Sequence, residues 1–158
     1  MKFKAPAFLM ALALTAPLAL AAYADSPALP SAATADQVTT SKLVYGLLSD
    51  SRYAYRPRAL DAATSKDVFK RYLEALDGSK QFFTQADITR FAPFEANIAT
   101  AIRGGELEPA FQVFAVYKQR VGERVGYARK LLKQDFDFSV DESYSFDREE
   151  SAWATSTP

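Results

Sequence analysis

Apolar side chains recur at helical spacing through most of this chain, and that periodicity restricts its fold more than any other feature. Between residues 36 and 134 the apolar positions fall three and four residues apart. A strand-like alternation appears only briefly, at Phe136, Phe138 and Val140. Antiparallel helices packed face to face are the simplest way to bury such stripes. The sequence therefore predicts an all-α fold, a small antiparallel bundle of about four to five helices over residues 36–134.

The first two helices have recognisable boundaries. One apolar stripe runs from Asp36 to Asp50. The next helix is predicted to begin at Thr64 or Ser65, either of which can cap its N-terminus. Gly78 can adopt the left-handed conformation that ends many helices, so we expect this helix to stop there. Its apolar face consists of Val68, Phe69, Tyr72, Leu73 and Leu76.

Further cap residues, prolines and glycines delimit the rest of the bundle. Thr84 and Asp87 have the spacing of a capping box. Pro93 either ends or kinks the helix that follows, or lies in the first turn of a new one, and Gly104 with Gly105 ends that stretch. The longest helix is predicted from Pro109 to Gln134. Its predicted apolar stripe is Phe111, Phe114, Val121, Val125, Ala128 and Leu132.

The N-terminal residues 1–24 have the pattern of a cleaved secretory signal. Lys2 and Lys4 precede an apolar run over residues 5–20, which is too short and too interrupted by proline to span a membrane. Small residues then stand at the −3 and −1 positions of a signal-peptidase site, so that the predicted cleavage residues are Ala22, Ala24 and Asp25. We therefore expect export, to the periplasm in a Gram-negative source, and no stable membrane insertion afterwards. Residues 25–35 are predicted to be a flexible lead-in.

The residue types present exclude several kinds of catalysis. The 158 residues contain no Cys and no His, which removes thiol chemistry, the histidine-based nucleophile arrangements and the usual imidazole metal ligand. Adjacent Ser–Lys pairs occur, but neighbouring residues on a helix point in different directions. The acids of residues 135–150 lack the spacing of a calcium loop. We expect no cofactor, no metal and no self-contained catalytic site.

Cations and aromatic residues alternate in the connection over residues 53–63 and just before it. Such a mixture can bind single-stranded nucleic acid, but loss of residues 1–24 leaves 17 Lys and Arg against 19 Asp and Glu, so we expect no nucleic-acid partner. The tyrosines are expected to pack while the arginines stay solvated or meet the acidic tail. A protein-contact role is the other interpretation, with Arg52, Tyr53, Tyr55, Arg56 and Arg58 as its candidate residues.

Residues 135–158 form the last predicted segment, an extended acidic connector. We expect it to dock loosely on a helical body that is richer in basic residues. Trp153 lies near its end and needs an apolar surface to lie on. That surface is either the bundle itself or a partner beyond residue 158, and Trp153 joins the candidate protein-contact residues.

Two groups of residues carry a family resemblance over roughly residues 36–154. The first is Phe69-x-Arg71-Tyr72-Leu73-x-x-Leu76-Asp77-x-x-Lys80-x-Phe82-Phe83-Thr84-x-x-Asp87. The second follows in the same order: Phe136-Asp137-Phe138, Asp141-Glu142-Ser143 and Phe146-Asp147-Arg148 through Trp153. Together they resemble the N-terminal region of the tail-specific proteases, the long periplasmic members of the carboxy-terminal processing protease family.

The resemblance implies a helical domain that precedes a PDZ domain and a protease domain with a Ser-Lys dyad. Members of that family cut proteins recognised by apolar C-termini, without a metal, and a periplasmic lipoprotein adaptor can dock on the enzyme. Neither the PDZ groove nor the dyad falls within these 158 residues, so we expect a truncated connector and no proteolysis from this chain alone. The alternative is a stand-alone secreted all-helical protein-interaction module.

Overall fold

The computed structural model describes residues 29–157, which contain five helices and no strand. The helices are α2 (Ala35–Ser49), α3 (Ala62–Asp77), α4 (Gln85–Glu95), α5 (Ile98–Gly104) and α6 (Glu108–Leu131). All belong to one compact unit that begins at Ser31. The predicted all-α class is confirmed. The predicted signal peptide and cleavage residues Ala22, Ala24 and Asp25 lie outside the described residues.

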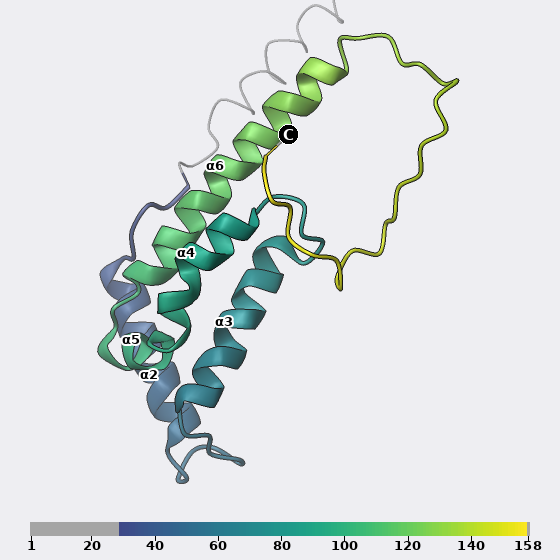
Figure 1. The fold of residues 1–158 in the computed structure, drawn as a ribbon. Helices are drawn as coiled ribbons and strands as arrows, with labels where there is room; N and C mark the ends of the chain where they lie inside the picture. The colour runs from purple at the N-terminus through teal and green to yellow at the C-terminus, as the bar shows by residue number, and fades with distance from the viewer. Residues whose placement is uncertain (1–28, 158) are drawn as a thin grey trace, which may run out of the picture. The chain divides into compact units, whose positions relative to one another are not determined.

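Antiparallel neighbours build the bundle, as expected. In Figure 1, α3 and α4 run in opposite directions, and so do α4 and α6. Helix α5 packs against both α2 and α3. The core is formed by six apolar side chains, drawn from four of the helices and from the turn that precedes α4. They are Phe69, Leu73, Phe83, Phe91, Ile98 and Val113.

Helix α3 begins differently from the prediction but ends where it was predicted to end, with Gly78 as its C-cap. Its N-cap is Asp61, whose Oδ1 accepts a hydrogen bond from the Thr64 amide at 2.8 Å. Ser65 is buried instead, and its Oγ accepts a hydrogen bond from the Ala99 amide at 3.3 Å, which ties α5 to α3. Gly78 stays right-handed (φ −59°), and the left-handed residue is Lys80 (φ 50°). Thr64 and Ser65 therefore do not cap the helix, whereas Gly78 caps its C-terminal end without the left-handed conformation that was predicted.

The turn after α3 is held by a side chain rather than by a glycine. The buried carboxylate of Asp77 accepts hydrogen bonds from three successive amides, those of Gln81, Phe82 and Phe83, at 2.7–2.9 Å. Because these bonds fix the turn, Gly78 does not need to leave the helical region.

Helix α4 has the predicted capping box. The Thr84 hydroxyl accepts from the Asp87 amide at 3.3 Å, and the Asp87 carboxylate accepts from the Thr84 amide at 2.9 Å. Pro93 lies inside the last turn of α4, which ends two residues later. Gly105 then ends α5 in the left-handed conformation (φ 76°), and a Cβ there would lie 2.7 Å from Cγ1 of Val38 on α2. The chain reversal and the close approach of α2 both require glycine at this position.

The buried face of α6 is not the one that the apolar pattern predicted. Val113 is fully buried, and Val116 and Tyr117 pack on the same core. Arg120 completes this face through an ion pair with Asp87. Of the predicted stripe, Phe111, Phe114 and Val121 are half-buried, while Val125, Ala128 and Leu132 are exposed. The wrong face was predicted because Arg120, a cation, occupies the fourth position of the buried stripe and interrupts its apolar periodicity.

Candidate protein-contact surfaces

The last described residues return to the end of α3 and the start of α4. We call residues 148–154 the strap. Its anchors are a hydrogen bond from Lys80 Nζ to the Ser151 carbonyl at 2.7 Å and one from the Gln85 amide to the Ala154 carbonyl at 2.8 Å. The Trp153 ring meets Phe83 edge-on, with 6.0 Å between ring centroids, and Lys80 Nζ lies 5.7 Å from its centre. Trp153 therefore folds back on the bundle, the first of the two predicted arrangements.

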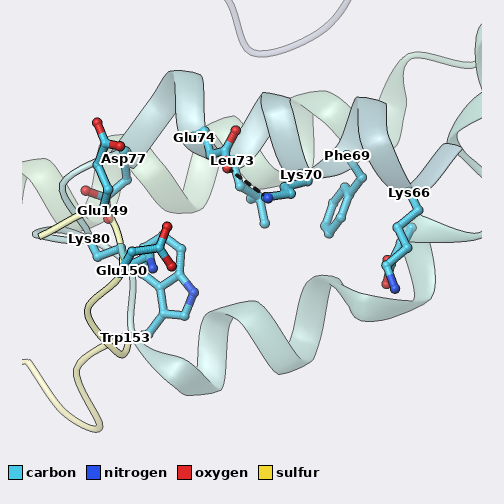
Figure 2. Close-up of a pocket in the computed structure, with 12 residues that line it drawn as sticks. Lys66, Phe69, Lys70, Leu73, Glu74, Asp77, Lys80, Glu149, Glu150 and Trp153 are labelled. Carbon is cyan, nitrogen blue, oxygen red and sulfur yellow. Dashed lines mark ion pairs between the residues drawn. The ribbon is translucent and has the colours of Figure 1, made fainter. Parts of the chain in front are cut away.

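A groove of about 540 Å³ runs between α3 and the strap (Figure 2). Phe69 and Leu73 provide apolar surface along it, and Trp153 closes one end. Its border carries charges of both signs, from Lys66, Lys70, Glu74, Lys80, Glu95, Glu149 and Glu150. The two ion pairs at its border are long, 3.7 Å for Lys70–Glu74 within α3 and 3.9 Å for Lys66–Glu95 between α3 and α4. Such exposed pairs contribute little to stability, so their side chains can pair with other groups.

The second charged cluster is structural. Arg120 donates two hydrogen bonds of 2.9 Å to Asp87, and its third nitrogen contacts Glu123 at 2.8 Å. Burial raises the pKa of Asp87, but hydrogen bonds from Arg120 and Thr84 outweigh that effect and hold this pKa below its usual value. The ion pair of Arg120 with Asp87 and the hydrogen bonds of Asp77 were not predicted from the sequence. The only sequence signal for the ion pair was the capping box at Asp87 and an arginine far along the chain.

The arginine–tyrosine loop, residues 50–61 between α2 and α3, is open to solvent. Tyr53 and Tyr55 are 67% and 95% exposed, so the expectation that the tyrosines pack is wrong. Arg52 pairs with Asp50 at 2.6 Å, while Arg56 and Arg58 are exposed. The loop lies at the N-terminal end of α3, whereas Trp153 packs near the C-terminal end of the same helix. The structure therefore does not bring the six candidate contact residues together.

Across residues 29–157, no three His, Cys, Asp or Glu side chains are grouped so as to hold a metal ion. None of the helices in that range is both long and apolar enough to cross a membrane.

Together, these features define a helical domain whose charged interior groups hold its own turns and helices, with a groove and a loop at its surface. Comparison with known proteins identifies the family. Residues 47–158 match the family described as the tail specific protease N-terminal domain, and the chain belongs to that family. The match begins inside α2 and includes the loop, the groove and the strap.

A curated relative agrees with this assignment. The chain is 31% identical over 99 residues to the Tail-specific protease of Haemophilus influenzae, an alignment that covers 62% of this chain. The same alignment spans only 14% of that relative's length. This chain therefore corresponds to only a small fraction of the length of that relative.

Proposed function

We propose that this chain is the non-catalytic N-terminal domain of a periplasmic tail-specific serine endopeptidase that acts on proteins with apolar C-termini. The observation that carries the proposal is the family match over residues 47–158. In this role the domain supplies a folded scaffold and contact surfaces, and other domains of the enzyme supply the nucleophile. Export by a signal peptide over residues 1–24 is part of the proposal.

The surroundings of the Ser–Lys pairs support a role without catalysis. The Ser41 hydroxyl donates to the Val38 carbonyl at 2.9 Å, and the Ser65 hydroxyl accepts the Ala99 amide. Next to Ser79, the Lys80 ammonium donates to the Ser151 carbonyl at 2.7 Å. Each pair thus has a member committed to a structural hydrogen bond, and a lysine that donates to a carbonyl is not available as a general base.

The groove along α3 is the surface that we assign to contacts with the other domains of the enzyme. It combines apolar surface from Phe69 and Leu73 with charged borders of both signs. Protein contacts commonly pair an apolar centre with a polar rim in this way. The strap forms one wall of the groove, and any following domain would be joined to the bundle through the strap.

One observation favours the alternative, a stand-alone secreted helical interaction module. Trp153 packs against the core, and hydrogen bonds anchor the strap on both sides of that residue. A finished domain needs a closed C-terminal side of this kind. The two proposals differ in whether proteolysis depends on this domain.

Purified alone, the chain is expected to leave a reporter protein with an apolar C-terminal tail intact. The physical reason is that no activated nucleophile is available, since the chain contains neither Cys nor His and its Ser–Lys pairs are engaged. The measurement is reporter cleavage by gel and mass spectrometry, with the Haemophilus influenzae protease as the positive control.

Mass spectrometry of the exported chain should also give an N-terminus at Asp25. Reporter cleavage by the isolated chain would refute the non-catalytic role, and a retained N-terminus would refute the signal peptide.

A further inference from the structure

Helix α2 carries an apolar surface that the bundle leaves uncovered. None of its residues is buried, and it packs mainly against α5. The side chains of Leu43, Val44, Leu47 and Leu48 remain 45–62% exposed. They lie three and four positions apart and so form one stripe on the helix. A contiguous apolar stripe on a short helix is unfavourable in water, which indicates that it meets another surface.

Basic side chains surround this stripe. Residues 42–60 contain four Lys and Arg against a single acid, Asp50, which is already paired with Arg52. The Arg58 amide donates to the Leu48 carbonyl at 3.1 Å, which places Arg58 at the C-terminal end of the stripe. The Arg103 guanidinium of α5 lies 5.2 Å from the centre of the Tyr45 ring on α2. We call residues 42–60 the basic–apolar face.

The opposite character occurs in residues 135–147, the acidic–aromatic segment. It contains five Asp and Glu and no Lys or Arg. Five apolar or aromatic side chains alternate with these acids, and Phe138 and Phe146 are 93% and 89% exposed. The aromatic rings pair only locally, Phe136 with Phe138 and Tyr144 with Phe146. Apart from a hydrogen bond of 3.3 Å from Gln81 Nε2 to the Tyr144 hydroxyl, the segment thus presents its apolar side chains and negative charge to solvent.

We infer that the acidic–aromatic segment of one chain docks on the basic–apolar face of a second copy. Figure 1 shows the segment leaving the end of α6 as a wide loop, well away from α2 in the same chain. The strap then holds its far end at Lys80 and Gln85. Each chain presents one surface of each kind, so two copies can exchange segments reciprocally in a two-fold dimer. Apolar contact supplies affinity, and opposite charge fixes which surfaces meet.

Only these two surfaces take part in the proposed dimer, which requires no catalytic partner. It goes beyond the proposed function by naming a second copy as the occupant of α2 and of the arginine–tyrosine loop. A negative result for the dimer therefore leaves the role in a protease unaffected, because the experiment contains no proteolytic readout.

Charge-swap variants of the whole chain test the inference by sedimentation equilibrium. One variant carries Arg56→Glu and Arg58→Glu, and the other carries Asp135→Lys and Asp141→Lys. Wild type is expected to dimerise reversibly at about 50 µM chain in about 50 mM salt, and the dimer should weaken at least about tenfold in about 500 mM salt. Each variant alone should be weakened by at least about tenfold. Their equimolar mixture should regain association, because one contact of the mixed dimer joins the two unaltered surfaces and the other brings the introduced lysines opposite the introduced glutamates.

A matched control carries Arg71→Glu and Arg90→Glu, two exposed arginines outside both surfaces, and should dimerise like wild type. Circular dichroism checks that every variant keeps its helices, which is expected since all the altered side chains are exposed. A chain that stays monomeric at every concentration would overturn the inference. Dimers that persist in both swap variants, or a mixture that does not regain association, would also overturn it.

Discussion

Replacing Arg120 by methionine is expected to lower the free energy of unfolding by about 3 kcal/mol. The Asp87 side chain is only 7% exposed and receives two hydrogen bonds of 2.9 Å from the Arg120 guanidinium. Without the arginine, a carboxylate remains buried between α4 and α6 with no compensating charge. This expected loss is at the lower end of the range for removing one partner of a buried ion pair, because the Arg120 side chain keeps 21% of its surface exposed.

Urea denaturation followed by circular dichroism measures this loss. The control is Arg124→Met on the same helix, because Arg124 is exposed and its replacement should change stability by no more than about 0.5 kcal/mol. Equal effects at positions 120 and 124 would show that the ion pair contributes nothing.

The same pair predicts a pH dependence. The pKa of Asp87 is below its usual value in the folded chain, so its ionisation stabilises the fold above about pH 4. This contribution is lost as the pH falls through the folded-state pKa. In the Arg120→Met variant only burial and the Thr84 hydrogen bonds remain, so the difference in stability between wild type and variant should narrow below about pH 4. A difference that stays constant down to about pH 2 would contradict the assignment.

Replacing Phe83 by alanine is expected to cost about 4 kcal/mol. Its side chain is 1% exposed and lies at the centre of an aromatic cluster, with ring-centroid distances of 5.5 Å to Phe91, 5.8 Å to Tyr117 and 6.0 Å to Trp153. The substitution leaves a cavity where the bundle and the strap meet. Fluorescence of Trp153, the single tryptophan in the chain, should also shift to the red as its ring loses this contact.

Leu132→Ala is the control, because that side chain is 70% exposed and lies outside both surfaces of the proposed dimer. Its stability should stay within about 0.5 kcal/mol of wild type. Thermal and urea unfolding of the two variants, read by circular dichroism and by Trp153 fluorescence, compare the sites directly. A loss at Phe83 no larger than that at Leu132 would place the core elsewhere.

Local sequence patterns were sufficient wherever a single segment determines the structure. Apolar periodicity predicted all five described helices in outline, and Thr84 with Asp87 predicted the α4 cap. Gly105 was also recognised, because a left-handed helix end is a local property. The start of α3 was predicted wrongly because several nearby polar residues could cap it, and Asp61 does so.

Interactions between distant segments could not be predicted in the same way. Arg120 lies 33 residues from its partner Asp87, and it replaces an apolar residue in the buried stripe of α6. Trp153 needed a surface, but nothing in the sequence indicated that Phe83 and Lys80 provide it. The groove along α3 depends on that same docking, so it became visible only in the folded chain.

Immunodepletion of a periplasmic extract tests most directly whether this domain serves a tail-specific protease. Antibody raised against residues 25–158 is used to remove the native protein, and cleavage of a reporter with an apolar C-terminal tail is measured before and after. The expected result is that the cleavage activity leaves the extract with the antibody and that the bound protein is several-fold larger than this domain. Undiminished cleavage in the depleted extract, with only the short chain bound, would contradict the protease role and favour the stand-alone interaction module.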